Sequence, residues 1–168
     1  MAMRWCPDLT VAAIVARDDR FLVVEERING QLVLNQPAGH VEDGESIVSA
    51  CIRETLEESA WVFTPQHLVG TYLWRTPRSG RTTLRFAFCG DVSDFDPQRR
   101  LDRGIVATHW LTRQQLAGHE QRLRGPLVLR CIDDYLAGQR FDLSAVASVL
   151  NEGGTEQALT LPLRSVSV

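Results

Sequence analysis

The sequence lacks the cysteine patterns that mark zinc fingers and disulfide-rich domains. Its four cysteines are widely spaced and none forms a CxxC pair. A chain of 168 residues can bury a core without cross-links. We therefore expect reduced and mostly buried thiols. The four positions are Cys6, Cys51, Cys89 and Cys131.

Long apolar runs and a strong excess of one charge are also missing. The apolar run at residues 11–16 is too short to cross a bilayer or to form the core of a secretory signal. The net charge of −3 gives no reason to expect a nucleic acid or a membrane as the main partner. We expect a cytoplasmic protein, a monomer or small homo-oligomer, whose partner is a small molecule.

The chain does contain β-branched apolar runs that alternate with two helical segments, without an internal repeat. Residues 47–59 lack Gly and Pro, and their apolar side chains share one side at ~100° per residue, which predicts an amphipathic helix capped near Ser46. A second helix is expected over residues 126–137, ending at Gly138, and a further helix start at residues 112–116. The runs that predict strands are residues 10–16, 21–24, 31–35, 67–74, 82–88 and 107–111.

This order of elements predicts an α/β (α+β) domain with a mixed β-sheet. Residues 91–103 are polar and acid-rich, so a loop is expected there. We expect one domain over residues 1–143. Residues 144–168 contain Gly153-Gly154 and no clear periodicity, which predicts a loosely held tail.

The first helix carries an acidic face. Glu54, Glu57 and Glu58 have the spacing i, i+3, i+4, so their carboxylates project from one arc of the helix. Carboxylates this close repel one another, and a divalent cation such as Mg²⁺ or Mn²⁺ would relieve the repulsion. Spacing alone leaves the alternative of a solvated helix face open, because acidic clusters are common on exposed helices.

The surroundings favour the metal site. Gly39 lies in a tight loop from which a bare backbone carbonyl can reach a cation. Glu45 lies at the helix start, and Arg53 directly precedes Glu54, where it can pair with a carboxylate and fix its geometry.

These residues resemble the Nudix box, in which Gly, Glu and the sequence Arg-Glu-x-x-Glu-Glu recur at fixed spacing. Two positions depart from the pattern, because Ala60 replaces a glycine and Trp61 an aliphatic residue. An alanine in a left-handed helix cap costs about 1 kcal/mol, so the departure affects the turn after the helix more than the carboxylates. The six fixed positions present are Gly39, Glu45, Arg53, Glu54, Glu57 and Glu58.

Segments outside the box are similar to the NudJ phosphatase group within the Nudix family, over roughly residues 8–143. The resemblance implies the Nudix fold, a mixed β-sheet packed between helices. It also implies hydrolysis of nucleoside tri- and diphosphates or related pyrophosphates, with hydroxymethylpyrimidine pyrophosphate and thiamine pyrophosphate among the candidates. The matching segments are residues 21–26, 35–40, 84–86, 123–128 and 137–140.

The resemblance implies that Glu54, Glu57 and Glu58 bind Mg²⁺ or Mn²⁺ with the carbonyl of Gly39, braced by Glu45 and Arg53. A carboxylate would accept the proton of the attacking water. The alternative is a non-catalytic nucleotide- or effector-binding Nudix module, which the retention of all three helix glutamates disfavours. The candidates for the proton acceptor stay open: Glu54, Glu58, Asp94, Asp96, Asp102 and Glu120.

Substrate contacts are expected from the hairpin near residues 75–85. Arg81 and Arg85 share a face if both lie on a strand, and arginines suit phosphate groups. Arg85 has the stronger case because it falls in the NudJ-like match. Trp74 is assigned either to stacking on a ring or to core packing, and His40 either to a phosphate contact or to a loop.

Overall fold

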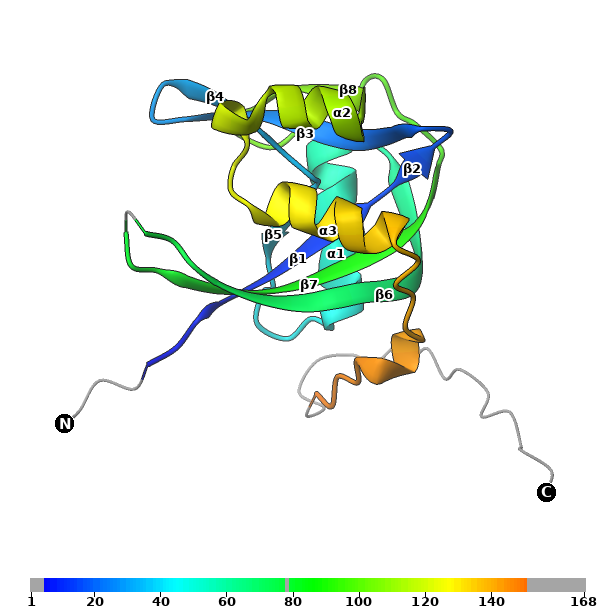
Figure 1. Cartoon of the computed structure of the whole chain (residues 1–168). Helices are drawn as coiled ribbons and strands as arrows, with labels where there is room; N and C mark the ends of the chain where they lie inside the picture. The colour runs from blue at the N-terminus through cyan, green and yellow to red at the C-terminus, as the bar shows by residue number, and fades with distance from the viewer. Residues whose placement is uncertain (1–4, 78, 151–168) are drawn as a thin grey trace.

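The computed structural model describes residues 5–77 and 79–150. Strands and helices alternate along the chain and build two β-sheets with helices around them (Figure 1). The strands are β1 (Asp8–Ile14), β2 (Ala16–Arg17), β3 (Arg20–Ile28), β4 (Gln31–Asn35), β5 (Ala38–His40), β6 (Val62–Arg75), β7 (Thr82–Ser93) and β8 (Ile105–Thr112). The helices are α1 (Ile47–Ser59), α2 (Arg113–Gly118) and α3 (Leu127–Leu136), with 3₁₀ turns η1 (Glu120–Arg122) and η2 (Leu143–Ala145).

The first sheet is mixed, with the strand order β5-β1-β7-β6. Strand β1 runs parallel to β7 and antiparallel to β5, and β6 is antiparallel to β7. The second sheet is antiparallel and pairs β3 with β2, β4 and β8. The predicted fold class is therefore confirmed, although the strands divide between two sheets.

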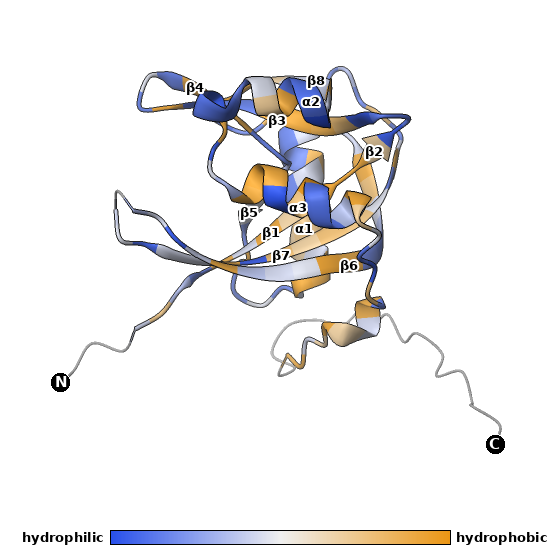
Figure 2. Ribbon diagram, in the orientation of Figure 1, coloured by the Kyte–Doolittle hydropathy of each residue, from blue (hydrophilic) through white to orange (hydrophobic). Residues whose placement is uncertain are grey.

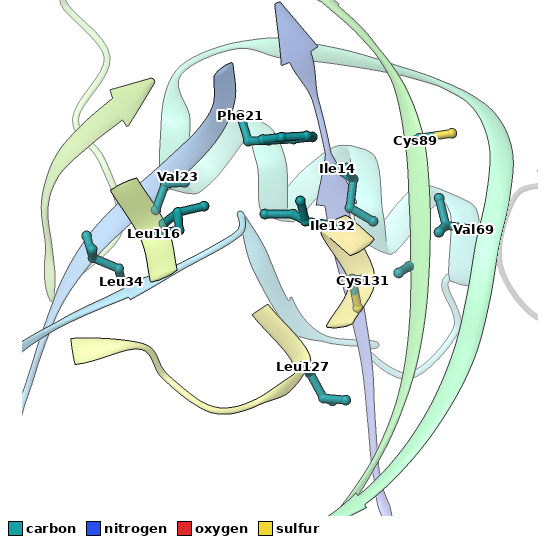
Figure 3. Close-up of a cluster of buried hydrophobic side chains, with 11 residues drawn as sticks. Ile14, Phe21, Val23, Leu34, Val69, Cys89, Leu116, Leu127, Cys131 and Ile132 are labelled. Carbon is teal, nitrogen blue, oxygen red and sulfur yellow. The ribbon is translucent and has the colours of Figure 1, made fainter. Parts of the chain in front are cut away.

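Helices cover both faces of the mixed sheet because β1 is apolar on both sides. Ile14 packs with Ile132 of α3 in one cluster (Figure 3), and Val11 packs with Cys51 of α1 in the other. A central strand buried on both faces reads as a continuous apolar run, since its side chains alternate between the faces. In Figure 2, β1 is coloured mainly as hydrophobic, α3 has both hydrophobic and hydrophilic residues, and the β3–β4 turn includes hydrophilic residues.

Helix α1 covers the predicted residues 47–59, and Ser46 caps it by accepting a hydrogen bond from the Ser49 N–H at 3.0 Å. Its last turn ends at Ala60, whose φ of 61° is the left-handed conformation expected there. Helix α3 lies inside the second predicted helix, and Gly138 follows it with a φ of 84°.

Several segments differ from the sequence-based expectations. Gly39 was expected in a tight loop but lies in the short strand β5, because β1 offers this segment a pairing edge. Strand β6 begins at Val62, earlier than predicted, and accommodates Pro65 at a register shift. Strand β7 continues to Ser93, so the expected loop starts later.

The cysteines behave as expected in the described structure. Cys51, Cys89 and Cys131 are buried, Cys6 is exposed, and all four are free thiols. Within residues 5–77 and 79–150, no helix is both long and apolar enough to cross a membrane. The proposed tail boundary stays a prediction, because residues 151–168 lie outside the described residues.

Candidate active site

Two carboxylates of the acidic face of α1, those of Glu54 and Glu58, line a cleft of about 800 Å³ between the two sheets, whereas Glu57 is not among the residues that line it. The mixed sheet contributes Thr10 and Arg85, α1 contributes Glu54 and Glu58, and Arg124 comes from the loop before α3. Pockets of roughly 300–1,000 Å³ are usual for small-molecule ligands. The cleft therefore has the dimensions of a nucleotide-sized site.

Arg53 is the hub of the acidic face. Its guanidinium donates two hydrogen bonds to Glu45, at 2.7 and 3.1 Å, and one each to Glu54 and Glu57, both at 2.9 Å. A further bond at 3.0 Å reaches the backbone carbonyl of His40. The hydrogen bonds with Glu45, ahead of those with Glu54 and Glu57, raise the pKa of Arg53, so the guanidinium stays charged. The expected pairing thus joins the helix to the loop that precedes it.

Glu54 lies against Gly39 of strand β5. A Cβ atom at Gly39 would overlap the carboxylate of Glu54, so only glycine permits this approach. Burial raises the pKa of Glu54, against the opposing effect of Arg53. The structure therefore brings the predicted glycine and the first predicted metal-binding carboxylate together.

Of the three helix carboxylates, Glu58 has the negative charge that is least compensated by a neighbouring cation. Its Oε2 accepts a hydrogen bond from the Ala38 N–H at 2.8 Å. Burial raises its pKa to about 8, and the nearby carboxylates of Glu54, Glu26 and Asp102 add to the rise. The carboxyl group thus lies in an acidic environment where a cation would favour the ionised form.

Among the proposed proton acceptors outside the helix, only Asp102 lines the cleft. Its backbone N–H donates to the Glu57 carbonyl at 3.0 Å, which fixes the loop against α1. Asp94, Asp96 and Glu120 are not among the residues that line the cleft, and the Asp96 N–H donates to the Ala60 carbonyl at the far end of α1.

The donor set fits a divalent cation, although its ligands are not already gathered. In the part of the chain that the structure describes, no group of three or more His, Cys, Asp or Glu is arranged to hold a metal ion. Arg53 occupies oxygens of Glu54 and Glu57 instead. The buried carboxylates and the backbone carbonyl of Gly39 are nevertheless the kind of hard oxygen donors that Mg²⁺ and Mn²⁺ use.

Arg85 lies in a cross-strand row on the floor of the cleft. The pairing registers place Tyr72, Arg85, Thr10 and His40 side by side across β6, β7, β1 and β5. Arg85 is only 8% exposed, and its Nε has no hydrogen-bond partner within the described residues. Among the same residues, no carboxylate lies within ion-pair distance of its guanidinium.

The other predicted substrate residues lie at the rim. Arg81 precedes β7 and donates two hydrogen bonds of 3.0 Å to the carboxylate of Asp8. Its charge is therefore paired, unlike the charge of Arg85 within the described part of the chain. Trp74 and His40 line the cleft, and the indole of Trp74 lies where a Cβ atom at Gly125 would clash. Arg75 bonds to Gly80 within the hairpin, and Arg78 lies outside the described residues.

Several polar residues that line the cleft were not indicated by sequence spacing, among them Thr10, Asn35, Glu26 and Arg124. Thr10 and Asn35 each have a buried side-chain oxygen without a partner in the described structure. Glu26 and Arg124 face each other with a donor–acceptor distance of 3.5 Å. These residues come from separate strands and a loop, so no local spacing could have linked them. Glu26, Asn35 and Arg124 fall in the segments that resemble the NudJ group, and that resemblance is the one sequence signal that could have marked them.

Comparison with known proteins gives one consistent family. The NUDIX domain model matches residues 7–130. The chain is 37% identical over 140 residues to Phosphatase NudJ of Escherichia coli strain K12, covering 83% of this chain and 90% of that protein.

Solved structures agree. A NUDIX hydrolase from Nitrosomonas europaea superimposes with a TM-score of 0.84 and 46% identity, covering 86% of this chain and 98% of that one. The NUDIX domain of Shewanella oneidensis NrtR, solved with ADP ribose, shares the fold with a TM-score of 0.63 at 17% identity, covering 80% and 90% of the two chains. The chain therefore belongs to the NUDIX domain family and is a Nudix hydrolase.

Proposed function

We propose that this protein hydrolyses phosphoanhydride bonds in nucleoside tri- and diphosphates or related pyrophosphates, as a NudJ-like phosphatase that depends on Mg²⁺ or Mn²⁺. The observation that carries the proposal is one cleft with opposite chemistry on two sides. Glu54 and Glu58 form a carboxylate side that favours a cation, and Arg85 is a buried guanidinium that favours an anion. A metal-bound phosphate ester satisfies both.

The metal would be held by Glu54, Glu57 and Glu58 with the carbonyl of Gly39. Arg53 would then keep its two bonds to Glu45 and release oxygens of Glu54 and Glu57, which it holds in the described structure. When bound, such a cation neutralises phosphate charge and lowers the pKa of a coordinated water. Glu45 and Arg53 would fix the direction of the carboxylates by anchoring the loop at His40 to the helix.

The protein's own groups would position the substrate and take up the proton. Arg85, with Arg81 and His40 nearer the rim, would bind phosphate oxygens, and Trp74 would stack against a ring. Glu58 and Asp102 are the carboxylates best placed to accept a proton from water, because both line the cleft beside Glu54.

The second candidate function is a non-catalytic nucleotide- or effector-binding module. All three helix glutamates, Glu45 and Arg53 are present, so nothing in the acidic face is lost. A binding module would have no need for two desolvated carboxylates whose ionisation is opposed by burial. The acidic face therefore favours the enzyme.

A substrate panel with separated products tests the proposal. The purified protein is incubated with Mg²⁺ and nucleoside tri- and diphosphates, hydroxymethylpyrimidine pyrophosphate or thiamine pyrophosphate, and orthophosphate and pyrophosphate are measured separately. A NudJ-like phosphatase releases orthophosphate, and a pyrophosphohydrolase releases pyrophosphate. Glu57→Gln serves as the inactive reference.

Thermal unfolding of the same samples distinguishes the alternatives. A binding module gains stability from the nucleotide and Mg²⁺ without consuming the nucleotide, whereas an enzyme consumes it. Stabilisation by a ligand of the panel, with no product from any member, would reject the proposed hydrolysis and support the binding module.

A further inference from the structure

Arg85 is a buried cation, and within the described residues no carboxylate lies within ion-pair distance of its guanidinium. It is 8% exposed; burial lowers the pKa of the guanidinium and the nearby Arg124 acts in the same direction, whereas Cys131 and Glu58 act against it. Of these neighbours Arg124 is a second cation. Burying an unpaired charge is strongly unfavourable, and a like charge nearby adds to the penalty. An anion bound beside Arg85 would pair with its charge and offset the repulsion from Arg124.

Arg124 is held beside the same floor by its backbone. The Arg124 N–H donates to the Leu34 carbonyl at 2.9 Å, and Leu123 forms a bridge with Leu34. The following Gly125 lies close against the ring of Trp74, where no side chain would fit. The loop is thereby fixed between β4 and β6, with Arg124 on the wall of the cleft.

The Arg124 side chain is only weakly engaged. Its Nη1 lies 3.5 Å from Glu26, and 46% of its side chain is exposed. An exposed ion pair of this length contributes little, so Arg124 can turn to another anion at small loss. Glu26 lies beside the acidic face, because its charge adds to the raised pKa of Glu58.

Thr10 adds a third donor to this region. It is the direct cross-strand partner of Arg85 in the β1–β7 register, so both side chains leave the sheet on the same face. Its hydroxyl is buried and has no partner within the described residues. Thr10, Arg85 and Arg124 all line the same cleft, so its wall carries one hydroxyl and two guanidiniums that can donate hydrogen bonds.

We propose that Arg85, Arg124 and the Thr10 hydroxyl form a subsite for a terminal phosphoryl group, which selects diphosphate and triphosphate monoesters over diphosphates esterified at both ends. This inference rests on the proposed function and names its substrate class. A terminal phosphoryl group carries close to two negative charges and three free oxygens. Two guanidiniums and a hydroxyl match that number of oxygens, and arginine binds phosphate through paired N–H groups.

A phosphoryl group esterified on its outer side fits the subsite less well. It has one charge and two free oxygens, so one guanidinium satisfies it and the second stays without an anion. The difference between the two substrate classes should therefore depend on Arg124, whereas Arg85 serves both.

The matched probes are the methylene-bridged analogues of ADP and of ADP-ribose, which resist cleavage at the bridge and differ in whether the outer phosphoryl group is esterified. Their dissociation constants are measured by titration calorimetry in Mg²⁺ buffer. The proteins are the wild type, Arg124→Ala, Arg124→Lys and the control Arg99→Ala, which removes an exposed positive charge outside the cleft. Circular dichroism checks that each variant is folded.

We expect Arg124→Ala to weaken binding of the ADP analogue by about 10- to 100-fold, the range of a lost charged hydrogen bond, and the ADP-ribose analogue by less than about 3-fold. Arg124→Lys should lie between, and Arg99→Ala should match the wild type. Equal losses for both analogues, no loss for either, or a wild type that binds neither would each overturn the subsite.

The measurement needs no turnover, so it is independent of the hydrolysis assay. A wild type that prefers the ADP analogue through Arg124 but releases no product from any pyrophosphate would reject the proposed function and leave the subsite standing. Hydrolysis of a pyrophosphate, together with no effect of Arg124→Ala on the binding of either analogue, would support the proposed function and overturn the subsite.

Discussion

Replacing Glu58 by glutamine should make the metal-free protein more stable above pH 7 and should also remove its turnover. Burial raises the pKa of this carboxyl from its ordinary 4.5 to about 8, and the neighbouring carboxylates act in the same direction. The folded state therefore binds a proton that the unfolded state has already released. Glutamine keeps the acceptor for the Ala38 N–H but carries no charge.

The sign follows from the direction of the change. A carboxyl whose folded pKa is raised leaves stability intact below 4.5 and diminishes it as the pH rises through about 8. Each pKa unit corresponds to about 1.4 kcal/mol, so the ionised form loses on the order of 5 kcal/mol when fully shielded from solvent. Water in the open cleft screens part of this, and we expect roughly 2 kcal/mol at pH 8.5.

Urea unfolding at several pH values between 6 and 9, in a chelating buffer, measures the effect. The wild type should lose stability across this range more steeply than Glu58→Gln, and Mg²⁺ should restore the wild type far more than the variant. Glu120→Gln, outside the cleft, is the matched control and should follow the wild type. Parallel wild-type and Glu58→Gln curves would refute the account of Glu58 as a desolvated carboxylate.

Four further changes have defined outcomes. Glu57→Gln should cut turnover about 100-fold or more with the fold intact, and near-normal rates would reject its role at the metal. Gly39→Ala should displace the Glu54 carboxylate and reduce both Mg²⁺-induced stabilisation and activity; an unchanged response to Mg²⁺ in thermal unfolding would contradict the close approach. Arg85→Gln should raise KM about tenfold or more, and an unchanged KM would exclude Arg85 from phosphate binding. Ala60→Gly should stabilise the protein by about 1 kcal/mol through its left-handed φ of 61°, whereas a loss in urea unfolding would mean that the buried methyl group outweighs the strain.

Much of the local architecture followed from the sequence. The absence of Gly and Pro, the apolar side and the cap at Ser46 located α1 over Ile47–Ser59, because helix formation depends on neighbours within a few residues. The left-handed conformation at Ala60 followed from the position of the box glycine. Strand β5 could not be predicted, since three residues beside a proline form a strand only through the edge that β1 provides.

The composition of the acidic face also followed from the local sequence. Glu54, Glu57 and Glu58 project together because the helix repeats every 3.6 residues, and Arg53 was expected to pair beside them. The sequence did not indicate that Arg53 would hold Glu45, Glu54 and Glu57 at once, which requires the loop before the helix to fold back onto it.

The arrangement of the residues in the proposed phosphoryl subsite depends on the tertiary structure. The parallel register of β1 and β7 places Thr10 beside Arg85, although 75 residues separate them along the chain. Arg85 is buried because α3 packs over its face of the mixed sheet, and Arg124 reaches the same region from a loop held by β4. The sequence by itself determined that Glu54, Glu57 and Glu58 project from one arc, since one helix orders them. Only strand pairing between distant segments determined which cations face them across the cleft.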